Sequence, residues 1–128
     1  MRVRDLAARA GVVPHIVRYY ARIGLLEPRR DPNNRYREFE ERDIARVTFI
    51  RNAQALGFTL EEVGLLIRSA DNHERANRQV RGLVAARLRV KRRELENLRP
   101  LLRAAERVVG NWRPERADIS ELMRAISG

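Results

Sequence analysis

Arginine and tyrosine side chains stand together at two places in the N-terminal half of the chain. Residues 18–20 read Arg-Tyr-Tyr and residues 35–37 read Arg-Tyr-Arg. Guanidinium groups bind phosphate oxygens through paired hydrogen bonds, and tyrosine hydroxyls also donate to phosphate. The two groups therefore indicate binding of a polyanion.

Neither enzyme chemistry nor metal binding has support in the sequence. It contains no Ser, His and Asp set, no glycine-rich phosphate loop and no carboxylate pair in a plausible cleft. The only histidines, His15 and His73, are far apart in the sequence, and there is no cysteine to supply a thiolate. We expect no enzymatic activity, no cofactor and no metal site.

The net charge of +10 comes from 27 basic and 17 acidic residues. Such an excess favours a polyanionic partner, because binding releases condensed counterions. Biased codon usage is an alternative explanation, since 26 of the 27 basic residues are arginine. Residues 1–58 and residues 59–128 each carry +5, so charge does not identify the half that binds.

No hydrophobic segment suggests export or membrane insertion. The first eleven residues lack the apolar stretch of a signal peptide. No run approaches the ~18 apolar residues of a membrane span. We expect a cytoplasmic protein with no membrane partner.

Helical spacing and glycines predict two short helices in the first 24 residues. The first ends at Gly11, Pro14 suits the first turn of the second, and Gly24 ends it. Such a pair with a glycine-containing turn is typical of a helix-turn-helix, although other small helical domains also contain such pairs.

A hairpin is predicted after the second helix. Turn-forming residues at 31–34 separate apolar segments at 25–28 and 36–39, which we expect to form two short strands, or a wing.

Two further helices follow the hairpin. Residues 41–56 are predicted as a helix with Phe49 on its inner face. Thr59 and Glu62 predict a capping box that starts the next helix, which runs to about Ser69.

A heptad pattern marks the C-terminal half. It occupies eight positions spaced alternately four and three residues apart: Val84, Leu88, Lys91, Leu95, Leu98, Leu102, Ala105 and Val109. A helix over 80–109 would be ~45 Å long, too long to bury this stripe on its own small domain. We therefore predict a homodimer, against the alternative of one helix that covers its own domain. Lys91 in the stripe can specify register, and Pro100 predicts a kink near Glu96.

These elements predict a mainly α-helical fold in three parts. A winged helix-turn-helix DNA-binding domain is expected over residues 1–70, and a linker and dimerisation helix over 71–110. A loop and short helix over 111–128 are too short to fold alone and must pack on another element.

Four motifs give the sequence a specific resemblance to the MerR family of transcription regulators. They occupy residues 6–12, 17–26, 35–37 and 56–62, in the family's order and spacing, and the resemblance covers 3–70. It implies a regulator that binds double-stranded promoter DNA as a homodimer, through an antiparallel coiled coil of the long helices. It also implies DNA distortion in an overlong promoter spacer and cooperation with RNA polymerase.

The resemblance implies that the second helix enters the major groove and that the wing contacts phosphates. The residues it assigns to DNA are Pro14, His15, Arg18, Tyr19, Tyr20, Arg35, Tyr36 and Arg37. Tyr20 is equally compatible with a core position, and His15 with an exposed position without a role. Arg29, Arg30 and Arg35 form either a phosphate-binding patch or a solvated turn.

Three residues depart from the family pattern. Val13 stands where Ser or Thr usually caps the recognition helix, a loss of ~1 kcal/mol. Ala21 follows the paired tyrosines where Glu is common, and Arg35 replaces a frequent wing glycine. We expect a changed helix start and a changed turn.

Metal-sensing members of the family carry cysteines at the start of the long helix and in the loop after it. The corresponding residues here are Asn77, Trp112 and Ser120, none of which binds a soft metal as thiolate does. Trp112 either packs the tail onto the long helix or lines a pocket for an organic effector. Action without any effector is an equal alternative.

A second interpretation comes from another functional class. The same fold would also serve a dimeric interaction or antagonist protein that does not bind DNA. The Arg-Tyr-Tyr motif and the wing favour the DNA-binding regulator.

Overall fold

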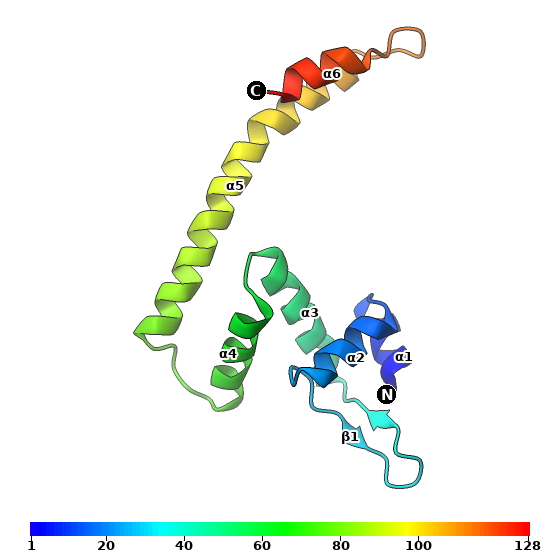
Figure 1. Ribbon diagram of the computed structural model, residues 1–128, viewed down its shortest axis with the longest axis vertical. Helices are drawn as coiled ribbons and strands as arrows, with labels where there is room; N and C mark the ends of the chain where they lie inside the picture. The colour runs from blue at the N-terminus through cyan, green and yellow to red at the C-terminus, as the bar shows by residue number, and fades with distance from the viewer. The chain divides into compact units, whose positions relative to one another are not determined.

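The computed structural model describes all 128 residues and contains six helices and one two-stranded sheet (Figure 1). This confirms the predicted mainly helical class with a small wing. The chain divides into two compact units, Met1–Val84 and Ala85–Gly128, which we describe separately.

The first unit opens with the predicted helix-turn-helix. Helix α1 spans Val3–Ala10 and stops at Gly11, which adopts φ 71°, a left-handed conformation that suits glycine. Helix α2 spans Pro14–Arg22, with Pro14 in its first turn. Val13 precedes α2 without a side-chain cap, as expected from the loss of Ser or Thr.

The wing is shorter than the apolar pattern predicts. Strand β1 (Arg29–Arg30) pairs antiparallel with β2 (Arg37–Glu38), with Arg29 opposite Glu38. The prediction that the first strand includes Leu25 and Leu26 is wrong. Both side chains are buried in the turn before the hairpin, because they anchor the wing in the core of the unit.

Helices α3 (Arg42–Ala55) and α4 (Leu60–Asp71) complete the unit before the long helix. The predicted capping box is present at α4. Glu62 N–H donates to Thr59 Oγ1 at 3.1 Å, and Thr59 N–H donates to Glu62 Oε1 at 2.9 Å. Phe49, expected inside, is 43% exposed because it lies off the α3 face formed by Val47, Ile50 and Ala53.

One hydrophobic core joins these helices and the base of the wing. Its largest fully buried members are Leu6, Val17, Leu26, Val47, Ile50 and Val63. Each such side chain stabilises the fold by about 1.5–3 kcal/mol. Outside the core, the Arg9 guanidinium donates two hydrogen bonds to Glu41, which ties α1 to the start of α3 and lowers the pKa of the Glu41 carboxyl.

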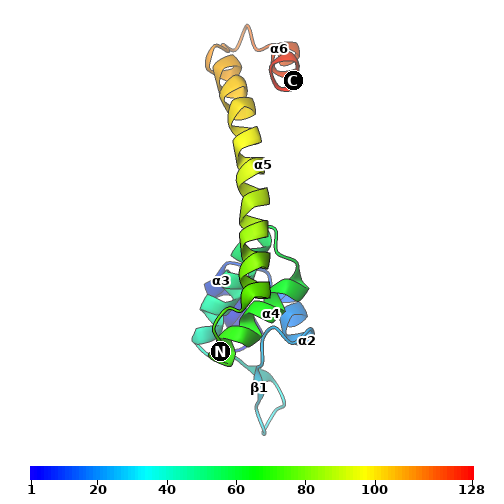
Figure 2. The ribbon, with the colours of Figure 1, turned by 90° about the vertical axis from the view of Figure 1, so that its left-hand side faces the viewer.

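Helix α5 spans Arg78–Gly110 as one continuous helix that contains Pro100. Its C-terminal end leans away from the line of the rest of the helix, which agrees with the kink that the sequence predicts near Glu96 (Figure 2). Asn77 starts α5, because its Oδ1 accepts from Val80 N–H at 2.8 Å. Val80 is buried in the first unit, and Val84 packs against that core.

The second unit contains the rest of α5 and the short helix α6 (Ile119–Ile126). Asp118 caps α6 by accepting from Ser120 N–H at 2.9 Å. Half-buried apolar residues occur on both helices and in the loop between them: Ala104, Ala105, Val108, Trp112, Leu122 and Ala125. No helix in the protein is long and apolar enough to cross a membrane.

Candidate nucleic-acid interface

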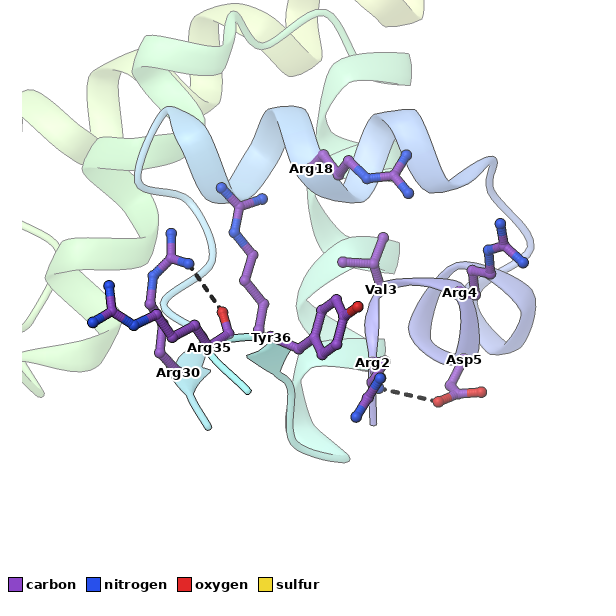
Figure 3. Close-up of a pocket in the computed structure, with 9 residues that line it drawn as sticks. Arg2, Val3, Arg4, Asp5, Arg18, Arg30, Arg35 and Tyr36 are labelled. Atoms are coloured by element: carbon purple, nitrogen blue, oxygen red, sulfur yellow. Dashed lines mark hydrogen bonds between the residues drawn. The ribbon is translucent and has the colours of Figure 1, made fainter. Parts of the chain in front are cut away.

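A basic recess of about 810 Å³ lies between the start of α1, the exposed side of α2 and the wing (Figure 3). We call this the arginine recess. Its lining residues are Arg2, Val3, Arg4, Asp5, Arg18, Arg30, Arg35, Tyr36 and Arg37. Six arginines thus surround one carboxylate, so the recess attracts anions.

Most of this charge has no partner within the chain. The side chains of Arg4, Arg18, Arg35 and Arg37 make no hydrogen bond or ion pair. Asp5 is engaged locally, since it accepts from Arg2 N–H at 3.1 Å at the start of α1. Four guanidinium groups are therefore available to an external anion, at no cost of breaking internal pairs.

The wing tip is held by its own backbone and by the side chain of Asn34. Asp31 N–H donates to Tyr36 O at 2.9 Å, and Arg35 N–H donates to Asp31 O at 2.8 Å. Asn34 Oδ1 accepts from Tyr36 N–H at 3.0 Å. Arg35 itself adopts φ 61°, the left-handed conformation that a glycine would adopt more cheaply.

The predicted DNA residues on α2 occupy different environments. His15 and Arg18 are exposed, and only Arg18 lines the arginine recess. Pro14 and Tyr19 are half-buried, and the Arg22 guanidinium lies 5.2 Å from the centre of the Tyr19 ring.

Tyr20 lies in the core. Its side chain is 2% exposed, and its hydroxyl donates to Gln54 Oε1 on α3 at 3.0 Å. Of the two positions that the sequence allowed for Tyr20, the structure has the buried one.

Sequence reasoning missed Arg2 and Arg4 as members of the recess. They join it because the wing returns to the start of α1, where Phe39 N–H donates to Met1 O at 2.6 Å. A local signal was nevertheless present. Cations at a helix N-terminus oppose the helix dipole, and a locally unfavourable charge often marks a functional position.

The heptad stripe on α5 is mostly uncovered within one chain. Leu88, Leu95, Leu98, Leu102 and Val109 are between 45% and 60% exposed. Lys91, also in the stripe, pairs with Glu94 at 2.9 Å. Val84 and Ala105 are half-buried. Exposed leucines at this spacing are typical of helices that pair in coiled coils.

The three positions considered for an effector have distinct local roles. Asn77 caps α5, and Ser120 N–H bonds to the Asp118 cap. Trp112 is half-buried, and its Nε1 is a buried nitrogen without a hydrogen-bond partner. No group of three His, Cys, Asp or Glu residues lies close enough together to hold a metal ion.

The helix-turn-helix, the wing and the arginine recess define a winged helix-turn-helix DNA-binding protein. The sequence profile of MerR HTH family regulatory proteins matches residues 1–70, and that of the MerR DNA-binding family matches residues 44–108. The chain belongs to the MerR family, and it is a sequence-specific DNA-binding transcription regulator.

Relatives share nearly the whole chain. An uncharacterized HTH-type transcriptional regulator of Pseudomonas aeruginosa is 34% identical over 90% of this chain and 90% of its own length. The regulator HmrR of Rhizobium leguminosarum is 31% identical over 95% of this chain and 97% of its own length. The mercuric resistance operon regulatory protein of Bacillus cereus is 34% identical over 94% of this chain and 90% of its own length.

Two solved structures share the fold. The transcription regulator PbrR691 of Ralstonia metallidurans, in complex with lead(II), is 28% identical with a TM-score of 0.63 over 89% of each chain. HiNmlR, a MerR family regulator lacking the sensor domain and bound to promoter DNA, has a TM-score of 0.72 over 98% of this chain and 94% of its own. At 15% identity, that second likeness concerns the fold alone.

Proposed function

We propose that this regulator grips promoter DNA with the arginine recess on the phosphate backbone and the exposed side of α2 in the major groove. The unpaired guanidinium groups of Arg4, Arg18, Arg35 and Arg37 carry the proposal. Fixed cations around a concave surface fit a phosphate backbone, which supplies affinity and register. His15, exposed early in α2, is then in reach of base edges.

Fluorescence anisotropy tests this arrangement. The probe is a labelled duplex of the intergenic DNA upstream of the chain's own operon, with a scrambled duplex of equal length as the control. We expect tighter binding to the intergenic duplex, and binding to both should weaken as salt rises. No binding to either duplex at low salt would support the alternative, a DNA-independent interaction or antagonist protein.

We also propose that the functional species is a homodimer joined by α5. The exposed stripe from Leu88 to Val109 supports this proposal. Leucines at heptad spacing stabilise a helix when the same positions of a second helix bury them. A dimer presents two copies of α2 to two half-sites, so the operator should be a palindrome. DNA distortion and cooperation with RNA polymerase rest on family resemblance, and run-off transcription from promoters of different spacer length tests both.

We propose that this regulator does not sense a metal ion through cysteine thiolates. The chain has no cysteine, and Asn77 serves as the cap of α5. Two alternatives stay open: an organic effector next to Trp112, whose Nε1 lacks an acceptor, and action without a ligand. The Bacillus relative is a mercuric resistance regulator and the Ralstonia relative is known in complex with lead(II), so mercury and lead are among the metals to test.

Two measurements separate these possibilities. Equilibrium dialysis against Hg, Pb(II), Cu(I), Zn and Cd, followed by elemental analysis, should find no tightly held ion. One ion per subunit that changes transcription would contradict the proposal. Trp112 is the only tryptophan, so a saturable change in intrinsic fluorescence would report an organic effector. We propose no catalytic role for any residue, and we expect action in the cytoplasm, where the DNA is.

A further inference from the structure

Arg2 precedes α1, but its side chain lies against the wing. Its guanidinium carbon is 4.3 Å from the centre of the Tyr36 ring. Figure 3 shows the Tyr36 ring reaching from the wing toward the start of α1, with the Arg2 guanidinium beside it. A guanidinium on an aromatic face is a favourable contact, and it joins two elements that are 34 residues apart.

Several other contacts hold Arg2 in this position. Its backbone N–H donates to Asp5 at 3.1 Å, and Phe39 N–H at the base of the wing donates to Met1 O at 2.6 Å. Its Nε lies 3.8 Å from Glu38 Oε1. The Arg2 charge is therefore engaged by a ring and a carboxylate, in contrast to the unpaired guanidinium groups of Arg4 and Arg18.

The wing needs such a support. Its strands have two residues each, and a two-stranded hairpin of that length is marginal by itself. Arg35, next to Tyr36, also holds a strained left-handed conformation. The position of Tyr36, which is 57% exposed, therefore depends on contacts from outside the wing.

We propose that Arg2 is a positioning residue of the DNA interface: it holds Tyr36 against α1, so that the wing keeps a fixed distance from α2, and it binds no phosphate itself. This inference rests on the proposed phosphate contacts of the wing. It assigns different roles to two arginines of the same recess, because Arg4 is free to bind a phosphate and Arg2 is committed to the ring.

The test compares Arg2→Gln with Arg4→Gln, using a scrambled duplex and the intergenic duplex over a range of salt concentrations. Arg4→Gln should reduce the slope of log affinity against log salt by about 0.9, the value for one phosphate contact. Arg2→Gln should weaken binding to both duplexes by about three- to five-fold and leave the slope unchanged.

A double-mutant cycle with Tyr36→Leu adds an independent readout. Arg2→Gln should have no further effect once the ring is gone, whereas it should keep its effect beside Tyr36→Phe, which retains the ring. Circular dichroism melting checks that each variant folds. A reduced slope with additive losses would overturn the proposal and make Arg2 a phosphate ligand, and unchanged affinity would make it a bystander. Failure of the wild-type chain to bind either duplex would instead contradict the proposed function.

Discussion

The two units of the chain differ in how far their apolar side chains are buried. All fourteen buried hydrophobic residues lie between Leu6 and Val80, whereas ten of the fifteen large exposed ones follow Ala85. The first unit has a closed core, and four arginines of the arginine recess have no partner in the chain. The second unit has no buried residue, and most of the large exposed apolar side chains belong to it. This contrast motivates both proposals, a polyanion as the partner of the first unit and an apolar helix as the partner of the second.

The largest effect should come from placing charges in the α5 stripe. Leu95→Glu with Leu98→Glu removes two leucines from the seam and buries two carboxylates there, which should yield monomers or unfolded chains. Multi-angle light scattering measures the outcome. Ala86→Glu with Asn97→Glu is the matched control, since it adds the same charge to α5 outside the stripe. A folded dimer from the Leu95/Leu98 variant would contradict the dimer proposal.

Cysteine cross-linking sharpens the same proposal, because the chain has no native cysteine. If two α5 helices pair antiparallel with their stripes in full overlap, Leu88 lies opposite Ala105 of the second copy. Leu88→Cys with Ala105→Cys should then form disulfide-linked dimers on oxidation, since bridged Cα atoms lie about 4.4–6.8 Å apart. Leu88→Cys alone should not, because the two copies of residue 88 would be ~26 Å apart along the axis. Cross-linking of that single variant would instead indicate a parallel pair.

A comparison of two arginines tests whether the positive charge of each unit contributes equally to DNA binding. Arg18→Ala, in the arginine recess, should weaken binding to all DNA sequences about tenfold and reduce the salt slope by about 0.9. Arg116→Ala, in the second unit, removes the same charge and should change neither quantity. Anisotropy titrations at several salt concentrations measure both. Equal losses from the two variants would mean that only total charge matters.

The sequence predicted well those features that depend on neighbouring residues. The Thr59 capping box, the Gly11 stop and the α5 stripe each follow from short spacings, and all are present. The family resemblance rested on equally local motifs. Such features survive because tertiary contacts do not have to be known to find them.

Features that depend on distant contacts were beyond the sequence. The sequence left Tyr20 open between a DNA contact and a core position, and the hydrogen bond from its hydroxyl to Gln54, 34 residues away, accompanies the core position. Arg2 enters the recess only because the wing returns to α1. Leu25 and Leu26 fit a strand pattern, but both side chains are buried in the core of the first unit. In each case a long-range contact decided between local alternatives.

The smallest expected effect concerns Arg35, where the phosphate-binding role and the stability of the wing are opposed. Arg35→Gly should relieve the left-handed strain, which costs about 1–2 kcal/mol, against about 0.5–1 kcal/mol for the greater flexibility of glycine in the unfolded chain. The variant should therefore be more stable by up to about 1.5 kcal/mol, yet bind DNA more weakly with a smaller salt slope. Arg29→Gly is the control, since it removes the same charge from strand β1. Glycine only adds flexibility there, so this variant should be less stable than the wild type. Urea denaturation and anisotropy measure the two quantities. If Arg35→Gly lost both stability and affinity, the wing would depend on the Arg35 side chain for its shape, and the first unit would be less self-sufficient than its closed core implies.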